Sequence, residues 1–515
     1  MIQNENTPPQ PPTPERRNFC RWGGVLLALI FIPLVILAIA LWSRFGGDVP
    51  VDYTKIEDHF KYGSTGGEHE TGFPYWIWQA MPQVCSEHLP GKGYASLGLI
   101  YEKGSDGKDK DLPVGVSKRR YQGVDRVFLN CAACHTSTVR DKPDSIARVI
   151  SGMPANAFNI MAFETFFFRC GADPKFTASY LIPEMQRLGA DLDLLDRYVV
   201  YPVAIAIMRD RVLTLAGRFK FVDTQPAWGP GRVDTFNSAK VIFNFPMDRV
   251  HPSELAAPAD FPSIWNQRPR KVRDDGEPMQ LHWDGNNTSV EERNKSAAFG
   301  TGTTPPTIDL KRIGRVEDWL LDAQPPAFEE HFPVDKNLVA RGLIVYKNYC
   351  ASCHGVNGTN FKGEFVGKVT PLEEIGTDRR RLDSYTYELA VNQSSLYAGY
   401  PWRFQHFRKT FGYANMPLDG LWLRAPYLHN GSVPTLRDLL EPSSRRPKVF
   451  YRGNDLYDPV KVGFVSAKAE EGGRQYFKFD TTVMGNSNVG HEGKQYGTEL
   501  SNREKAALVE YLKTF

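Results

Sequence analysis

Residues 335–355 read DKNLVARGLIVYKNYCASCHG, and this stretch decides the fold of the C-terminal part of the chain. It contains Cys350-Ala-Ser-Cys353-His354, which has the C-x-x-C-H spacing at which c-type haem is attached. The two thiols lie one turn apart, so that each can add to one vinyl group of the haem. The histidine that follows is then placed to bind the iron. The motif predicts a covalently bound haem c at Cys350, Cys353 and His354.

The segments around this motif predict a cytochrome c domain. Gly342 and Tyr346 precede the motif at the spacing of a cytochrome c first helix. The chain ends in a second predicted helix, 501–514, which begins with the capping pair Ser501 and Glu504. Its predicted apolar face consists of Ala506, Leu508, Tyr511 and Leu512. In small cytochrome c domains the first and last helices cross at a glycine, so we expect Gly342 to contact this face.

Cys131-Ala-Ala-Cys134-His135 is a second C-x-x-C-H motif. A zinc site or a redox pair is the competing interpretation of one such motif. Two copies, each followed at once by histidine, favour haem attachment at both. The upstream segment 126–130 has the pattern of an extended strand, so this haem is expected in a different pocket from the first. The sequence predicts two covalently bound haem c groups.

Composition and patterning predict two globular domains and an anchor. The chain has 515 residues, 41% of them hydrophobic, and a formal net charge of only +3, so no basic surface for nucleic acid is indicated. We predict a mainly α fold of two cytochrome c-like haem domains with irregular loops and a few short hairpins. The predicted boundaries are 46–330 for the N-terminal haem domain and 335–515 for the C-terminal cytochrome c domain. Helices are expected at 157–169 and 179–198.

The N-terminal segment predicts a membrane anchor. Residues 22–43 carry no charge and are long enough to span a bilayer, and three arginines precede them. The positive-inside rule then predicts a cytoplasmic tail, 1–21, and places the rest of the chain in the periplasm of a bacterium, outside its inner membrane. A cleavable signal peptide is the alternative, because Ala38 and Ala40 form a small-x-small pair.

Three cysteines lie outside the two motifs. Cys20 precedes the predicted span and is expected in a reducing compartment. Cys85 and Cys170 are both in the exported part, where they form either a disulfide or two buried free thiols.

Two further segments carry a family resemblance. Leu281-His-Trp-Asp-Gly285, followed by Ser289-Val-Glu-Glu292, is similar to the F-W-D-G-R-A segment of the di-haem cytochrome c peroxidases. Arg424-Ala-Pro-Tyr-Leu-His-Asn-Gly-Ser-Val-Pro-Thr-Leu436 is similar to their T-A-P-Y-x-H-D-G segment. The chain therefore resembles the di-haem cytochrome c peroxidase superfamily, and within it the branch that includes the rubber oxygenases. The resemblance covers most of residues 46–515.

The resemblance implies different roles for the two haems. The haem on His354 would be the six-coordinate transfer haem, and the haem on His135 would meet peroxide or oxygen. The peroxidases place a methionine ligand for the transfer haem after the Pro-Tyr-x-His segment, but 435–445 contains no methionine. His491 is the favoured sixth ligand, as a late histidine of the rubber-oxygenase kind. Met416, His429 and Met484 remain alternatives.

Three residues of the N-terminal part are candidates for the chemistry itself. His282 is expected near the His135 haem, as an iron ligand or as the base that moves a proton, although a core histidine is the plain alternative. Related proteins place a tryptophan between the haems as an electron relay, so Trp265 or Trp283 is a candidate for that role. Both could equally be core aromatics.

These residues predict a periplasmic oxidoreductase that carries two haems and has peroxidase-like or oxygenase-like activity. Its predicted partners are a redox protein or the quinol pool, a small oxidant such as peroxide or oxygen, and the membrane. The alternative is a membrane-tethered electron carrier that is not an enzyme. The coordination of the His135 haem separates the two, because a second protein ligand there would close the iron to small molecules.

Overall fold

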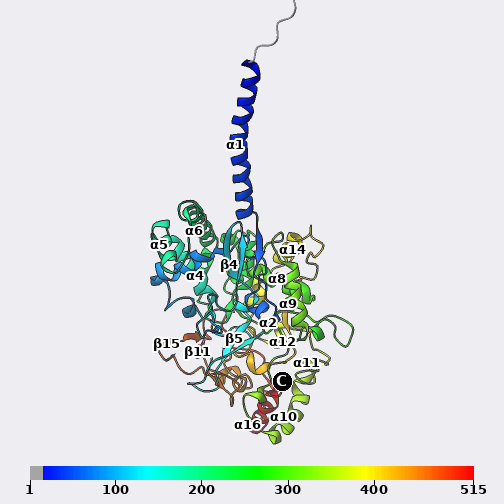
Figure 1. Ribbon diagram of the computed structural model, residues 1–515. Helices are drawn as coiled ribbons and strands as arrows, with labels where there is room; N and C mark the ends of the chain where they lie inside the picture. Colours follow the sequence, from blue (N-terminus) through cyan, green and yellow to red (C-terminus); the bar gives the residue numbers. More distant parts are fainter. Residues whose placement is uncertain (1–14) are drawn as a thin grey trace, which may run out of the picture.

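A computed structural model describes residues 15–515, so most of the predicted tail lies outside the described residues, as does the side chain of Cys20. The first helix, α1 (Glu15–Phe45), projects from the globular part (Figure 1). Its segment Leu27–Phe45 is apolar, exposed and long enough to cross a membrane. The chain therefore has one helix near its N-terminus that is either a membrane span or a signal sequence.

Helices make up 42% of the structure and strands 12%. The remaining helices differ widely in length, and several have only one or two turns. They are α2 (Ile56–Tyr62), α3 (Tyr75–Val84), α4 (Ile160–Ala172), α5 (Ala178–Arg187), α6 (Tyr201–Arg218), α7 (Thr235–Ile242), α8 (Val290–Gly300), α9 (Leu310–Asp322), α10 (Lys336–Tyr349), α11 (Ala351–His354), α12 (Leu372–Ile375), α13 (Arg380–Ser384), α14 (Tyr387–Leu396), α15 (Leu436–Leu439) and α16 (Asn502–Leu512).

The expected helix 179–198 is in fact two elements. The first, α5, ends at Arg187, and Gly189 follows with a φ of 98°, which a residue with a side chain rarely adopts. A π-helical turn, η4 (Asp196–Val200), then leads into α6. The expected helix 157–169 corresponds to α4, which Asn159 caps by accepting a hydrogen bond from the Ala162 N–H.

The strands form one four-stranded sheet and several pairs. The sheet has the order β1-β3-β4-β2, from β1 (Asp48–Pro50), β2 (Phe73–Pro74), β3 (Val116–Tyr121) and β4 (Val124–Leu129). The β3–β4 hairpin turns at Gln122 and Gly123, whose φ angles of 50° and 74° suit a two-residue hairpin turn. A sheet of this size was not expected, because the segments that form it lack the regular alternation of apolar and polar residues that marks a strand.

The other strands pair two by two and are antiparallel. They are β5 (Thr136–Val139) with β6 (Arg148–Ser151), β7 (Arg232–Val233) with β8 (Ala259–Asp260), β9 (Val369–Pro371) with β10 (Gly412–Ala414), β11 (Val449–Arg452) with β16 (Phe477–Asp480), β12 (Tyr457–Asp458) with β13 (Gly463–Phe464), and β14 (Glu470–Glu471) with β15 (Arg474–Gln475). These are the short hairpins that the sequence predicted, together with pairings between distant segments.

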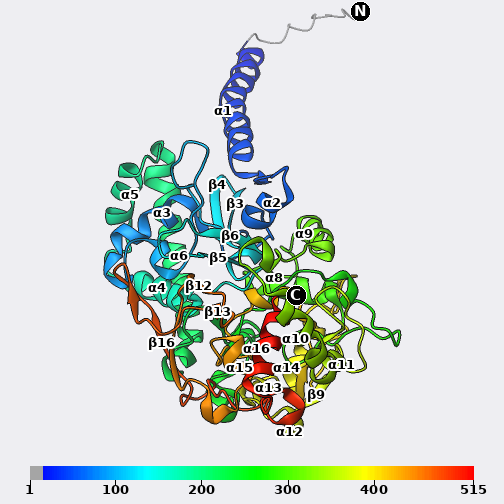
Figure 2. The same cartoon turned by 90° about the horizontal axis from the view of Figure 1, so that it is seen from below.

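The crossing of α10 and α16 has the predicted form (Figure 2). Gly342 is buried, and a Cβ atom placed there would lie 2.0 Å from the carbonyl oxygen of Ala507. Ser501 and Glu504 form the predicted capping box. Leu508, Tyr511 and Leu512 are buried as predicted, whereas Ala506 is exposed and its neighbour Ala507 is buried instead.

The packing is continuous across the predicted domain boundary at 330–335. One hydrophobic core combines Val139, Met153 and Trp265 with Phe328, Phe332 and residues of α16. A second core, built mainly from α3, α4, α5 and α6, lies wholly in the N-terminal part. Cys85 and Cys170 are joined there by a disulfide that ties the end of α3 to α4. Of the two alternatives for this pair, the structure has the disulfide.

Candidate haem-binding sites

The N-terminal motif follows the four-stranded sheet directly. The β4 strand ends at Leu129, and the Asn130 side chain accepts a hydrogen bond of 2.9 Å from the Ala132 N–H, which starts a tight turn through Cys131. The Asn130 amide also donates to the carbonyl oxygen of Gly63 at 2.9 Å. This capped turn holds the two thiols and His135 in place, as the strand-like pattern before the motif had indicated.

The C-terminal motif sits at the end of α10. Cys350 ends that helix, and α11 carries the motif to His354. The Tyr346 hydroxyl donates to the carbonyl oxygen of Gly355 at 2.8 Å, which ties α10 to the end of the motif. The two motifs are therefore presented by different local structures, a strand and turn in one case and a helix in the other.

The two motif histidines nevertheless make the same hydrogen bond. His135 Nδ1 lies 2.9 Å from the carbonyl oxygen of Pro262, and His354 Nδ1 lies 2.8 Å from that of Met416. A carbonyl oxygen only accepts, so Nδ1 carries the proton in both rings and Nε2 keeps a free lone pair. Burial lowers the pKa of His135 to about 4 and also lowers the pKa of His354. Both rings are thus held in the neutral form that binds metals.

The four motif thiols are free of disulfide bonds. Burial raises the pKa of Cys131 to about 11 and that of Cys350 to about 12. Burial likewise raises the pKa of Cys134 and Cys353. The thiols are accordingly unpaired and uncharged in the folded chain, and covalent haem attachment requires that they be unpaired.

His491 lies opposite His354. Their ring centres are 6.3 Å apart, and the ring planes are inclined by 47°. Two metal–nitrogen bonds of about 2 Å, with roughly 1 Å from each nitrogen to its ring centre, give a separation of about 6 Å for two imidazoles on one metal. The His491 Nδ1 atom is buried and has no hydrogen-bond partner among the described residues. Burial, with nearby His354 as a second cause, lowers the pKa of His491 to about 3.

The other candidates for the sixth ligand have different surroundings. The backbone carbonyl oxygen of Met416 accepts the hydrogen bond from His354 Nδ1. His429 is buried with its Nε2 atom 3.0 Å from the Tyr413 hydroxyl, and its ring stacks on that of Tyr413 at 4.1 Å. Met484 has an exposed fraction of 48%. Among these three residues, Met416 is the one that forms a hydrogen bond with the His354 side chain, through its backbone carbonyl.

A cavity lies between the two histidine anchors. Its lining includes both carbonyl-bearing residues, Pro262 and Met416, together with His282 and Trp283. His282 Nδ1 lies 2.5 Å from the amide oxygen of Asn286, so this ring also keeps a free Nε2. Burial lowers the pKa of His282 to about 4, and the ring is neutral at physiological pH.

The two candidate tryptophans have different places. Trp283 lines the cavity, its Nε1–H donates to the carbonyl oxygen of Asp260 at 2.8 Å, and its own carbonyl accepts from the Ala414 N–H at 2.9 Å. Trp265 is buried in the core that both halves share, and its Nε1–H donates to the carbonyl oxygen of Ser151 at 2.8 Å. Trp265 is not in the lining of this cavity.

Three arginines around the cavity had not been singled out in the sequence. Arg270 and Arg424 both bind Asp419 at 2.6 Å. The third, Arg293, has a buried nitrogen with no hydrogen-bond partner among the described residues. Burial lowers the pKa of Arg293 to about 10, because a guanidinium without a counter-ion is costly to bury. The sequence feature that could have pointed to Arg293 is its position directly after Ser289-Val-Glu-Glu292.

These residues fit haem c. Each motif offers two free thiols and an oriented histidine, and the cavity between them has three guanidinium groups against one carboxylate. The propionates of haem are carboxylates, which arginine binds well. Arg293 is the side chain with a buried donor still to satisfy.

Glu164 is a second residue that the sequence analysis did not single out. It lies on α4 in an otherwise apolar run, and one of its carboxylate oxygens is buried without a hydrogen-bond partner in the described part of the chain. Burial raises the pKa of Glu164 to about 8, and in its ionised form this carboxylate would further raise the pKa of the Cys134 thiol. The sequence feature that could have pointed to Glu164 is an acidic residue within the largely apolar stretch IMAFETFFFRC.

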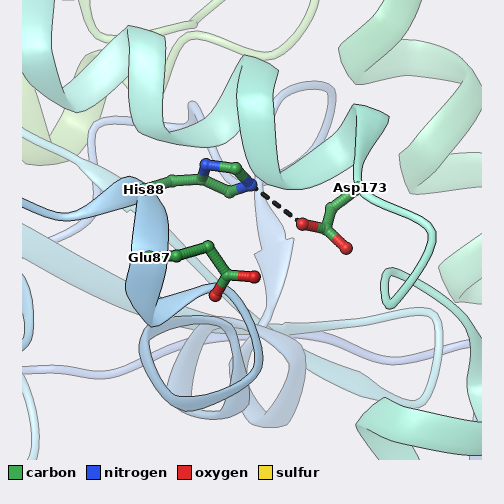
Figure 3. Close-up of side chains that lie close together, drawn as sticks. All are labelled: Glu87, His88 and Asp173. Carbon is green, nitrogen blue, oxygen red and sulfur yellow. Dashed lines mark hydrogen bonds and ion pairs between the residues drawn. The ribbon is translucent and has the colours of Figure 1, made fainter.

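A further polar cluster consists of Glu87, His88 and Asp173, which lie within three residues of the disulfide-bonded Cys85 and Cys170 in the sequence (Figure 3). His88 Nε2 lies 2.9 Å from Asp173, and Glu87 forms an ion pair of 2.5 Å with Lys175. The three potential ligand atoms lie within 4.8 Å of one another. Because Lys175 already neutralises Glu87, the cluster is explained as ion pairing across the two chain segments that the disulfide joins.

Comparison with known proteins identifies the segment that holds His354. Residues 412–451 match the family described as RoxA-like, cytochrome c-like, and this segment contains the Met416 carbonyl that binds His354 Nδ1. The uncharacterised protein y4iJ of Sinorhizobium fredii (strain NBRC 101917 / NGR234) is 28% identical over 531 residues, which cover 84% of this chain and 85% of y4iJ. The uncharacterised protein y4iM of the same strain is 32% identical over 305 residues, which cover 50% of this chain and 65% of y4iM. Residues 412–451 thus carry a RoxA-like, cytochrome c-like domain, which implies covalently bound haem c and a c-type cytochrome.

Proposed function

We propose that the protein is a di-haem c-type cytochrome whose His135 haem performs peroxidase-like or oxygenase-like chemistry. Cys131 and Cys134 would hold one haem, and Cys350 and Cys353 the other, with His135 and His354 as iron ligands. The matching bonds of the two histidines to Pro262 and Met416 support the assignment of both motifs to the same cofactor. The resemblance to the di-haem peroxidases and rubber oxygenases agrees with it.

The observation that carries this proposal is a difference between the two histidines. His491 faces His354 at 6.3 Å, a distance suited to closing an iron with two imidazoles. Within residues 15–515, no histidine ring faces His135 at a comparable distance. A haem bound there would supply an iron to which a small oxidant such as peroxide or oxygen can bind. The His354 haem, closed by His491, would serve electron transfer.

His282 is the proposed base for proton transfer at the His135 haem. His282 is neutral, and its Nε2 atom is free to accept a proton, while Asn286 holds the ring through Nδ1. Trp283 is the better placed candidate for electron transfer, because it lines the cavity that also contains the residues anchoring both histidines. Arg293 and Arg424 would bind propionates and stabilise negative charge in the same cavity.

We also propose that α1 anchors the protein in a bacterial inner membrane with the globular part in the periplasm. The apolar, exposed Leu27–Phe45 segment and the arginines before it support this orientation. The redox partner would be a periplasmic protein or the quinol pool. Attachment to the membrane would keep the protein close to either one.

The spin state of the resting protein tests the enzyme proposal. We expect electron paramagnetic resonance and absorption spectra to show one high-spin haem and one low-spin haem per chain. Peroxide should then change the high-spin signal. Two low-spin haems and no response to peroxide after partial reduction would instead indicate an electron carrier that is not an enzyme.

A further inference from the structure

The outer side of η4 and α6 is apolar and exposed. Five side chains along this segment have exposed fractions between 49% and 77%. They are Leu194, Tyr198, Val199, Val203 and Ile207. The opposite side of the same helix packs into the N-terminal core through Ile205, Met208 and Val212. The helix thus has two apolar sides, of which only one is covered by the described part of the chain.

This exposed surface begins at the foot of α1. Arg44, in the last turn of α1, forms ion pairs of 2.6 Å with both Asp193 and Asp196. Asp196 is the first residue of η4, so the double ion pair joins the end of the apolar helix to the beginning of the exposed surface. Figure 1 shows α6 on the same side of the globular part as α1, and α10 and α16 on the opposite side.

The order of residues along the segment suits the boundary of a bilayer. The most exposed apolar residues occupy the first part of the segment, exposed Asp210 and Arg211 follow them, and the less exposed Leu213 and Leu215 lie beyond. The exposed Arg197 side chain lies 5.5 Å from the ring of Tyr198, so a cation and an aromatic ring occur together beside Arg44. Tyrosine and arginine are typical of the headgroup region, where an apolar body and a polar tip can both be accommodated.

We propose that η4 and α6 lie on the outer surface of the membrane, with Tyr198, Val199, Val203 and Ile207 inserted between the lipid headgroups. The occupant of this apolar surface is lipid, because the surface is continuous with the end of the proposed membrane span through Arg44. The inference rests on the proposed membrane anchor and goes beyond it. The chain would touch the bilayer at two places, so that the globular part has a fixed orientation on the membrane.

A fluorescent label at Val203 tests this contact. The full-length, haem-loaded protein with Cys20→Ser and Val203→Cys is labelled with an environment-sensitive fluorophore and placed in vesicles of phosphatidylethanolamine and phosphatidylglycerol. We expect the emission to shift to the blue and to be quenched by nitroxide groups on the lipid chains. The matched control is Ile344→Cys, because Ile344 is also β-branched and is 64% exposed on α10. Its label should emit as in water.

A second variant separates insertion from simple closeness to α1. With the label at Val199→Cys, the changes Val203→Asp and Ile207→Asp should remove the blue shift and the lipid quenching. Haem content and co-flotation with vesicles should be unchanged, because both side chains are exposed and α1 is intact.

Three results would overturn the inference. Water-like emission at Val203 in protein that co-floats with vesicles would show that α6 stays off the membrane. A blue shift without lipid quenching would show that another protein or a second copy covers the surface. Failure to co-float at all would refute the proposed membrane anchor, and this contact with it.

Discussion

At the scale of single residues, His491 and His354 face each other with their ring centres 6.3 Å apart. We expect His491→Ala to convert one low-spin haem completely to high-spin, because it removes the imidazole that faces His354. The other haem should keep its spectrum. Magnetic circular dichroism and electron paramagnetic resonance measure both changes.

Met484→Ala is the matched control for this change, because Met484 is another of the candidate ligands but is exposed. Its spectrum should equal that of the unchanged protein. If the His354 haem stays low-spin in His491→Ala, the sixth ligand is another residue, and Met416 and His429 are the next to test.

Glu164 predicts a pH dependence of stability. Its pKa is about 8 in the folded chain and 4.5 ordinarily, so the folded state holds a proton that the unfolded state releases between these values. This carboxyl therefore makes the free energy of unfolding fall as the pH rises from about 4.5 to about 8, by on the order of a few kcal/mol in total. We expect Glu164→Gln to remove this fall and to stabilise the protein most above pH 8.

Chemical denaturation of the haem-loaded protein at pH 5, 7 and 9 measures the effect. Glu388→Gln on α14 is the control, because Glu388 is exposed and should change the free energy of unfolding little at any pH. Equal slopes against pH for Glu164→Gln and the unchanged protein would show that Glu164 is not buried as a neutral acid.

At the scale of elements, the crossing of α10 and α16 depends on Gly342. A Cβ atom there would lie 2.0 Å from the Ala507 carbonyl and 2.6 Å from the Tyr511 Cβ atom. The helices must then move apart, so we expect Gly342→Ala to destabilise the protein by about 1–3 kcal/mol. Thermal unfolding followed at the Soret band measures this change.

Gly314→Ala on α9 is the matched control, because nothing lies within 4 Å of a Cβ atom at that position. It should stabilise the protein by about 0.4–1 kcal/mol, through the reduced freedom of the unfolded chain. A Gly342→Ala protein as stable as the unchanged one would mean that the two helices do not cross at this residue.

At the scale of the whole molecule, the number of haems per chain follows from the two motifs. We expect a pyridine haemochrome assay to give two haems per chain, and Cys131→Ala with Cys134→Ala to give one. Haem staining after denaturing electrophoresis should remain positive in this double variant, because the second motif is intact. A count that stays at two would contradict haem attachment at Cys131 and Cys134.

The sequence by itself determined the local elements. The helix before Cys350 and the capping box of the last helix were predictable, because each depends on a few neighbouring residues. The contact of Gly342 with the last helix was expected from the likeness to small cytochrome c domains. The apolar N-terminal helix was predictable in the same way, since its composition alone marks it. The disulfide between Cys85 and Cys170 remained one of two alternatives.

Only the tertiary structure decided how distant segments meet. The carbonyl groups of Pro262 and Met416 hold the two motif histidines, yet a backbone carbonyl has no sequence signature. His491, which the family resemblance had favoured, faces His354, and Arg293 from the N-terminal half lines the same cavity as Met416 from the C-terminal half. The core shared by Trp265, Phe328 and α16 likewise joins the two halves. Such contacts depend on the path of the whole chain, whereas a helix or a haem motif depends on residues a turn or two apart.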